Sequence, residues 1–309
     1  MSTSFWLGTA ILVAAGLYVL GVSYKNTHEL LFNPTEARQA RYRAEPDQRP
    51  QQRFNEYDVA AQPLSLQTDD GINLKGWYVP SSTGATIILL HGYKMDSGEM
   101  APIAAMLVRH GFGIIAPDLR AHGESEGELI TFGQHEWQDV KAAADYIATH
   151  EPGNTLGILG NSMGGALAVC YAAQDERIQA VVAQSPYASV RHSLKQGIKY
   201  FTGLPPFPFV PLIRMFSLPY VDLDNPNISP LAMMPALKGK PVLILMGGAD
   251  EVVEPQGAKQ LFQAGGNITR LWLEPELTHV AFHTDRAEQF ERNIVEFFST
   301  NLLHRQPTP

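Results

Sequence analysis

The sequence has little cysteine and little basic charge, and each shortage excludes a class of protein. Cys170 is the single cysteine, so no intramolecular disulfide can form, and we expect its side chain to be a small core residue. Lysine and arginine number 23 against 31 aspartate and glutamate residues, a balance that argues against a nucleic-acid partner. No Cys/His cluster has metal-site spacing: His279 and His283 stand four residues apart, but no third ligand is evident. We therefore expect no metal.

Long apolar runs are also scarce, and the exception lies near the N-terminus. Phe5 to Val22 is a run of 18 residues without a charge, close to the roughly 20 that cross a bilayer core, and Trp6, Tyr18 and Tyr24 suit its interfaces. We predict a transmembrane anchor over residues 1–24. A cleaved signal peptide is the alternative, but no lysine or arginine precedes the run and no A-x-A site follows it.

Residues 25–55 are polar, with glutamine, arginine and proline throughout, and are predicted to form a tether with one short helix. Basic residues near the run, from Lys25 to Arg43, all lie on its C-terminal side. Positive charge tends to stay on the cytoplasmic side of a membrane. The sequence therefore predicts a single-pass protein of the cell membrane whose main domain faces the cytoplasm.

The remainder of the chain alternates between short apolar segments and amphipathic ones, which is typical of a doubly wound, mostly parallel sheet with helices on both faces. We predict one α/β domain over residues 56–304 and a tail over 305–309. Asp69-Asp70-Gly71 is a strong hairpin turn between the first two strands. The eight predicted strands are residues 63–67, 72–79, 85–90, 113–116, 155–159, 180–183, 241–246 and 269–273. The predicted helices lie near residues 98–110, 135–149, 163–174, 256–264 and 284–302.

One insertion, at about residues 187–238, interrupts this alternation. It is rich in prolines and aromatic residues, and a structureless loop of this length is improbable in a compact domain. We predict a small helical cap. Its aromatic side chains either form an apolar lid suited to acyl chains or simply pack the cap against the sheet.

The most informative motif is Gly160-Asn161-Ser162-Met163-Gly164, because it stands between a predicted buried strand and a predicted helix. This is the context of a nucleophile elbow, in which a strained turn exposes the serine hydroxyl beside a helix N-terminus. The alternative is a small residue in a tight turn. A second copy of the pattern, at residues 123–127, follows no apolar strand, so we interpret Ser125 as an exposed loop residue.

A serine nucleophile needs a histidine base and a carboxylate to orient that base. Asp250 and His279 follow the last two predicted strands, in the chain order that such a triad requires. Asp250 is alternatively the cap of the following helix. Other candidates are the nearby carboxylates Glu251 and Glu254 and, in place of His279, the later histidine His283.

The oxyanion formed during attack on a carbonyl requires two backbone N–H donors. Met163 directly follows the serine and supplies the first. Gly92 permits a close approach of the loop after an early strand, so the N–H of Tyr93 is our second candidate. We interpret His91 as a structural hydrogen-bonding residue rather than as a base.

From about residue 55 to 302, the chain resembles the α/β-hydrolase superfamily. Within it, the chain is most similar to bacterial membrane-tethered serine hydrolases of the monoacylglycerol-lipase, depalmitoylase-like and S33-peptidase-like branch. The resemblance implies hydrolysis of an ester, a thioester or an amide, and it makes the loop from Asp118 to Ser125 a structural signature. The matching blocks, in order, are His91-Gly92-Tyr93, residues 116–125, residues 160–165, Gly248-Ala249-Asp250 and Thr278-His279.

The sequence thus predicts a serine hydrolase with the triad Ser162, Asp250 and His279, which requires no cofactor. The apolar cap and anchor favour a carboxylic ester of a lipid or another acyl compound as substrate. An acyl thioesterase or protein deacylase and an S33-like peptidase are the enzymatic alternatives. A membrane-tethered binding module that has lost catalysis is the alternative outside enzymes.

Overall fold

An eight-stranded, mostly parallel sheet forms the centre of the computed structural model, which describes residues 3–237 and 239–303. The strand order is β1-β2-β4-β3-β5-β6-β7-β8; β2 is antiparallel to β1 and β4, and all other pairs are parallel. The predicted sheet is confirmed, and each predicted strand end lies within two residues of the observed one. The strands are β1 (Gln62–Gln67), β2 (Asn73–Val79), β3 (Ala85–Leu90), β4 (Gly113–Pro117), β5 (Thr155–Asn161), β6 (Ile178–Gln184), β7 (Val242–Gly247) and β8 (Thr269–Glu274).

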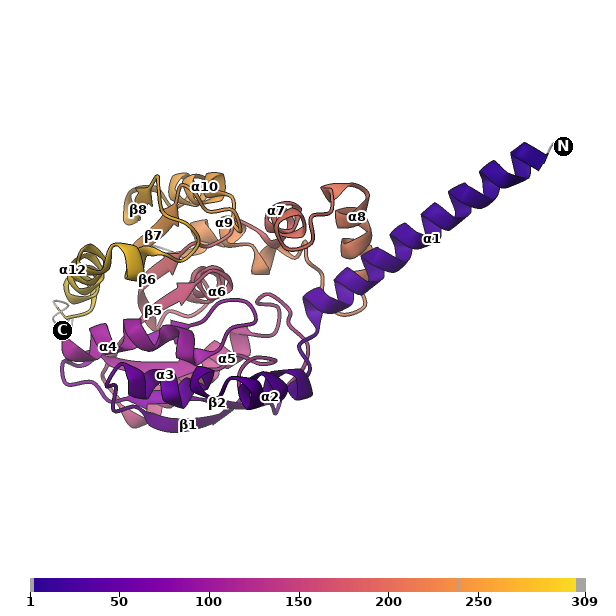
Figure 1. The fold of residues 1–309 in the computed structure, drawn as a ribbon. Helices are drawn as coiled ribbons and strands as arrows, with labels where there is room; N and C mark the ends of the chain where they lie inside the picture. Colours follow the sequence, from indigo (N-terminus) through magenta and orange to yellow (C-terminus); the bar gives the residue numbers. More distant parts are fainter. Residues whose placement is uncertain (1–2, 238, 304–309) are drawn as a thin grey trace.

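Helices cover both faces of the sheet (Figure 1). Central strands are buried on both sides, so β3 sends Ile88 and Leu90 into one core and Ile87 and Leu89 into the other. The first core is covered by α5 (Trp137–His150), α6 (Met163–Ala172) and α10 (Pro255–Gly265). The second is covered by α3 (Pro50–Glu56), α4 (Ala101–Arg109), α11 (Phe282–Asp285) and α12 (Ala287–Phe298). Short helical turns complete the domain: η2 (Ser97–Met100), η5 (Gly266–Ile268) and the π-helical η6 (Ser299–Leu303).

The chain between β6 and β7 forms a layer of short helices at one end of the sheet. Gly203, with a φ of 70°, ends the first of them, and the next has Pro205 at its N-cap and begins at Pro206. These helices occupy the insertion predicted at about residues 187–238, of which Lys238 lies outside the described residues. They are α7 (Val190–Thr202), α8 (Pro206–Ser217), η3 (Pro226–Ile228), α9 (Pro230–Met233) and η4 (Met234–Leu237).

The N-terminal helix α1 (Thr3–Leu31) is continuous and extends beyond residue 24, where the predicted anchor ends. Its first half projects away from the domain, and its second half lies beside α8 (Figure 1). The stretch Phe5–Leu31 contains an 18-residue window of mean hydropathy 2.0, which is long and apolar enough to cross a membrane. A signal sequence shares this property.

Residues 25–55 do not form the predicted tether. After α1 the chain continues as α2 (Thr35–Ala44), the turn η1 (Pro46–Gln48) and α3, all of them against the domain. Arg38 is the reason, because its buried guanidinium donates hydrogen bonds to the backbone carbonyls of Gly123 (3.1 Å) and Ser125 (2.7 Å). The predicted tail, residues 305–309, lies outside the described residues.

Candidate active site

Ser162 stands at a sharp turn between β5 and α6. Its φ of 53° and ψ of −113° are strained for a residue with a side chain, as the predicted elbow requires. Both flanking glycines are obligatory here. A Cβ on Gly160 would lie 2.2 Å from the backbone of Gly164, and one on Gly164 would lie 2.3 Å from the carbonyl oxygen of Leu90. The turn therefore closes only with glycine at both positions.

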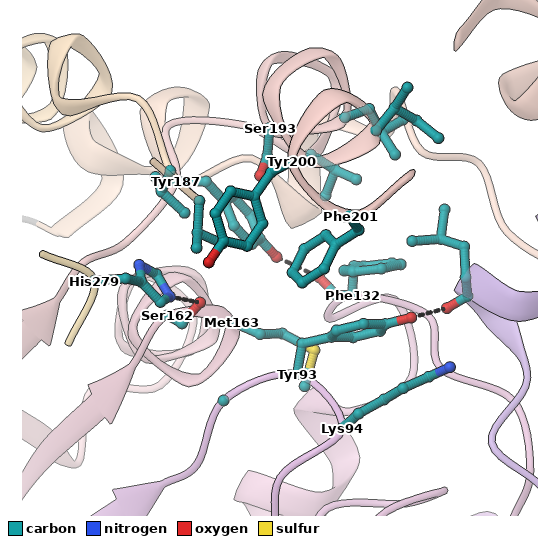
Figure 2. A pocket seen from close by; sticks show the side chains of 18 of the residues that line it. Tyr93, Lys94, Phe132, Ser162, Met163, Tyr187, Ser193, Tyr200, Phe201 and His279 are labelled. Carbon is teal, nitrogen blue, oxygen red and sulfur yellow. Dashed lines mark hydrogen bonds between the residues drawn. The ribbon is translucent and has the colours of Figure 1, made fainter. Parts of the chain in front are cut away.

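The three side chains of the predicted triad lie together, and Figure 2 shows the contact between Ser162 and His279. His279 Nε2 is 2.9 Å from Ser162 Oγ, and His279 Nδ1 is 2.7 Å from Asp250 Oδ2. An ionised carboxylate only accepts, so Nδ1 carries the proton and Nε2 is free to accept the proton of the serine hydroxyl. The loop that carries the base is held by the backbone N–H of Val280, which donates to the hydroxyl of Ser185 (3.1 Å).

The alternative role of Asp250, as the cap of the following helix, is wrong: Glu254 is the N-cap of α10, and Asp250 instead holds the turn before that helix. Its Oδ1 accepts the backbone N–H groups of Val252 (2.9 Å) and Val253 (2.8 Å), whereas Oδ2 faces His279. The competing residues do not join the triad: the side chains of Glu251 and Glu254 form no hydrogen bond with the histidine among the described residues. His283 is mostly buried, and burial lowers its pKa.

Two backbone N–H groups, those of Met163 and Tyr93, are the predicted oxyanion donors. Met163 is the first residue of α6, so its N–H has no acceptor one turn earlier. The carbonyl of Gly92 accepts a hydrogen bond from His91 Nδ1 (2.8 Å), and His91 Nε2 accepts the N–H of Leu119 (3.0 Å). Burial lowers the pKa of His91, which keeps the ring neutral for these two roles. Because a trans peptide directs its C=O and N–H to opposite sides, the N–H of Tyr93 points away from His91.

Ser162, Met163 and His279 border a cavity of about 710 Å³, within the usual range for small-molecule sites. The lining is mostly apolar and comes from the cap, the loop after β3 and the end of α1. Tyr200 and Phe201 of the cap helix α7 line the cavity on the side above the serine (Figure 2). The contribution of α1, through Asn26, Glu29 and Leu30, was not predicted from the sequence.

Comparisons with known proteins agree with this architecture. A model of the serine aminopeptidase S33 family matches residues 81–215. The Pyrococcus furiosus esterase Pf2001 superimposes with a TM-score of 0.69 at 26% identity, over 80% of this chain and 94% of the esterase. The chain belongs to the α/β-hydrolase superfamily.

Two bacterial relatives of the hydrolase are uncharacterised proteins. YqkD of Bacillus subtilis is 25% identical over 232 residues, which are 74% of this chain and 75% of YqkD. YfhR of Escherichia coli K12 is 27% identical over 257 residues, which are 79% of this chain and 82% of YfhR. In both cases the similarity extends over most of the two chains.

A further carboxylate of the hydrolase, Glu99, lies at the site and was not predicted. Its Oε2 accepts the N–H of Gly92 (2.6 Å), and its Oε1 accepts from the side-chain amide of Asn161 (3.3 Å). Burial raises its pKa, although the Gly92 hydrogen bond partly opposes this shift. In the sequence, Asp96 and Glu99 have the spacing of a capping box, which indicates a helix start rather than a site.

The second Gly-x-Ser-x-Gly motif of the hydrolase is structural, but our interpretation of Ser125 as exposed is wrong. Its side chain is buried, donates to the carbonyl of Asp118 (2.6 Å) and accepts the N–H of Lys75 (2.9 Å). The hydroxyl is therefore fully engaged in holding the loop. Cys170 is buried on α6, as expected of a core residue.

No group of three or more histidine, cysteine, aspartate or glutamate side chains within residues 3–237 and 239–303 is arranged to hold a metal ion. His279 is already placed between Ser162 and Asp250. The polar groups at the site of the hydrolase are thus arranged around the serine hydroxyl.

Proposed function

We propose that this hydrolase is a serine esterase that cleaves carboxylic esters of apolar acyl groups. The observation that carries the proposal is the continuous chain from Ser162 Oγ through His279 to Asp250, with distances of 2.9 and 2.7 Å, at the wall of a mostly apolar cavity. A serine hydroxyl is a weak nucleophile on its own, and this chain supplies both the base and the group that orients it.

The geometry supports a two-step reaction. Ser162 Oγ attacks the carbonyl carbon of the ester as its proton passes to His279 Nε2, and Asp250 stabilises the imidazolium that forms. The tetrahedral intermediate collapses to an acyl-enzyme when His279 returns the proton to the departing alcohol. In the second step a water molecule attacks the carbonyl carbon of the acyl-enzyme while His279 removes its proton. His279 then returns that proton to Ser162 Oγ as the bond to the serine breaks and the acid leaves.

The N–H groups of Tyr93 and Met163 stabilise the oxyanion in this proposal. Each lies on a backbone held by other groups: Met163 at the first turn of α6, and Tyr93 directly after Gly92, whose C=O accepts from His91 and whose N–H donates to Glu99. Donors that are fixed before the reaction need no reorganisation when charge develops. One such donor typically contributes about 10²–10³ in rate.

The lining of the cavity favours an acyl chain as the group that is bound. Buried side chains such as Leu194, Ile198 and Ile213 line it, and an acyl chain that displaces water from them gains about 0.8 kcal/mol for each buried CH₂ group. We further infer that α1 anchors the hydrolase in the cell membrane. The second half of α1 supports this role, because Ser23, Thr27 and Leu31 are buried against the domain and would be lost with a cleaved leader.

The match to the serine aminopeptidase S33 family makes amide hydrolysis the second candidate. A thioesterase or protein deacylase would use the same triad, since all three reactions pass through an acyl-enzyme. We expect the ester to react fastest. Loss of catalysis in favour of ligand binding is the remaining alternative, and a reactive Ser162 would exclude it.

Fluorophosphonate labelling tests the mechanism. The full-length wild-type protein in detergent is compared with Ser162→Ala and with Ser125→Ala, and the adduct is located by mass spectrometry. We expect an adduct on Ser162 only, and none in Ser162→Ala. Esters, thioesters and aminoacyl amides of matched acyl length then rank the substrate classes. Normal ester turnover by folded Ser162→Ala would overturn the mechanism.

A further inference from the structure

We propose that the outer face of the cap rests on an anionic lipid bilayer beside α1, so that the catalytic cavity opens at the level of the lipid headgroups. The cap face is defined here by Tyr200, Phe201, Phe207, Met215 and Leu218, and the cap cations are Arg191, Lys195 and Lys199. The proposal rests on the membrane-anchoring role of α1 proposed above. It adds a second contact with the membrane and a route of entry for the substrate.

The first argument is the length of the apolar run in α1. Phe5 to Val22 is 18 residues, about 27 Å of helix, and a bilayer core is about 30 Å thick. The whole run is therefore needed to cross. Yet Val19 and Val22, at its end, already pack against the core to which α8 contributes. Tyr24, the second residue after the run, meets Phe216 of α8 edge to face, with ring centroids 5.8 Å apart. A helix that spans a membrane thus brings α8 to the membrane boundary.

The second argument is the distribution of exposed apolar side chains. Outside α1, six of the ten large apolar side chains that are exposed among the described residues lie between Tyr200 and Tyr220. Phe207 is 79% exposed and Phe201 65%, on the two helices that border the cavity. Contiguous exposed apolar residues of this kind mark a protein or membrane contact.

The third argument is charge. The whole chain has a net charge of −8, but α7 contains the three exposed cap cations and no acidic residue. The buried side chains of α7, Val190, Leu194 and Ile198, face the domain. Basic residues beside exposed aromatic residues are the composition by which interfacial helices bind anionic lipids. In a symmetric dimer through this face the cap cations would meet each other and repel, so the local positive charge favours an anionic lipid surface over a second copy of the chain.

The cap face and the cavity share residues. Tyr200 and Phe201 line the cavity and are 50% and 65% exposed, so they form part of its mouth (Figure 2). On the far side of the cavity, Asn26, Glu29 and Leu30 come from the end of α1. An acyl ester that resides in the bilayer would therefore pass between the end of α1 and the cap helix α7 to reach Ser162 without crossing bulk water.

Site-directed spin labelling tests the location of the cap. The only cysteine, Cys170, is buried, so wild-type protein serves as the control for background labelling. Single labels are placed at Phe207→Cys, on the cap; at Leu12→Cys, in the free half of α1; and at Phe262→Cys, an exposed position on α10. All are made in the full chain in vesicles of phosphatidylcholine with phosphatidylglycerol. Collisions with oxygen and with a water-soluble nickel chelate report the depth of each label.

We expect the label at residue 207 to resemble the one at residue 12, with high oxygen and low nickel collision rates, and the label at residue 262 to be the reverse. A nickel-accessible label at 207 beside a lipid-embedded label at 12 overturns the proposal and leaves the anchor intact. A nickel-accessible label at 12 refutes the anchor, and the cap proposal fails with it.

Spin–spin broadening at 207 that disappears on dilution with unlabelled protein assigns the face to a second copy and also overturns the proposal. None of these results depends on turnover, so the esterase proposal is tested separately.

The role of charge has its own test. The label at residue 207 should move to greater depth when phosphatidylglycerol is added to pure phosphatidylcholine, and the triple substitution Arg191→Gln, Lys195→Gln and Lys199→Gln should abolish that shift. The matched control replaces three exposed cations elsewhere on the domain: Lys259→Gln, Arg270→Gln and Arg292→Gln. A shift that is equal in both triple variants contradicts the role of the cap cations.

Discussion

The hydroxyl of Tyr93 donates a hydrogen bond of 2.8 Å to the backbone carbonyl of Leu30, and this bond joins the proposed oxyanion loop to the last turn of α1. The adjacent Lys94 donates to the carbonyl of Glu29 (2.6 Å). The last carbonyls of a helix have no intrahelical partner, so these side chains satisfy groups that would otherwise need water. The N-terminal helix and the proposed oxyanion loop are thereby one connected unit.

Tyr93→Phe should slow catalysis without unfolding the protein. The substitution removes the bond to α1 but keeps the ring, which stacks on Phe132 at 5.7 Å between centroids. Loss of one such bond should lower kcat by roughly tenfold through misplacement of the Tyr93 N–H, while KM changes little. The control is Tyr220→Phe, whose ring packs against Phe32 of the same region. Equal kcat values in the two variants would show that the bond has no role in positioning the loop.

Asp250→Asn should separate the two functions of this carboxylate. The amide oxygen can still accept the N–H groups of Val252 and Val253, but its NH₂ group would face His279 Nδ1 and favour the wrong tautomer. We expect kcat to fall by about 10⁴ with a nearly unchanged thermal midpoint. Asp250→Ala should lose both the activity and several degrees of thermal midpoint. An asparagine variant with activity near that of the wild type would remove Asp250 from the triad.

Glu99 should control activity through its protonation state. Burial raises the pKa of this carboxyl, so at low pH it is neutral, and its ionisation at higher pH places a negative charge beside the developing oxyanion. Wild-type kcat should therefore fall as Glu99 ionises, and Glu99→Gln should lack that decline. Glu99→Ala leaves the N–H of Gly92 without its acceptor and should lower kcat at every pH. Superimposable profiles for wild type and Glu99→Gln would contradict this role.

Stability should depend on pH through Asp118. Burial, reinforced by repulsion from Asp96, raises its pKa from an ordinary 3.8 to about 7. Between these values the folded state binds more protons than the unfolded state, so stability falls as pH rises from about 4 to about 7, with a slope of at most about 1.4 kcal/mol per pH unit. Thermal midpoints of wild type and Asp118→Asn across this window measure the difference. The variant should be less stable overall, since one oxygen that accepts the N–H of Ser97 or Glu124 is lost, but it should lack this slope.

The parts of the fold that follow from local pattern were predictable. The apolar segments are short and bounded by polar residues, so their lengths indicated the strands. The two glycines around Ser162 indicated the tight turn, because only glycine fits at both positions. The order of Asp250 and His279 after the last two strands was enough to bring them together at one edge of the sheet. These features are local in the chain. Because parallel strands all end at the same edge of the sheet, residues that follow different strands are brought close together.

Features that depend on long-range polar contacts were not predictable. Arg38 looked like a tether residue because nothing in its neighbourhood shows that its partners are carbonyls 85 and 87 residues away. Ser125 looked exposed for the same reason, since its acceptor on Asp118 becomes a neighbour only after the loop folds back. Glu99 followed a helix-start pattern that conceals its contact with Gly92. The spacing of polar residues in the sequence does not indicate whether a given side chain is solvated or hydrogen-bonded to backbone carbonyls.

The unbroken course of α1 from Thr3 to Leu31 fixes the distance between its apolar run and the cavity. A flexible linker would let the domain move freely, but in a rigid helix each residue adds about 1.5 Å of length. Deleting one residue from the first half of α1, which projects away from the domain, would therefore shorten by about 1.5 Å the distance between the start of the run and the cavity. The number of residues in α1, and not only their hydrophobicity, thus sets the depth at which the proposed anchor would hold the cavity.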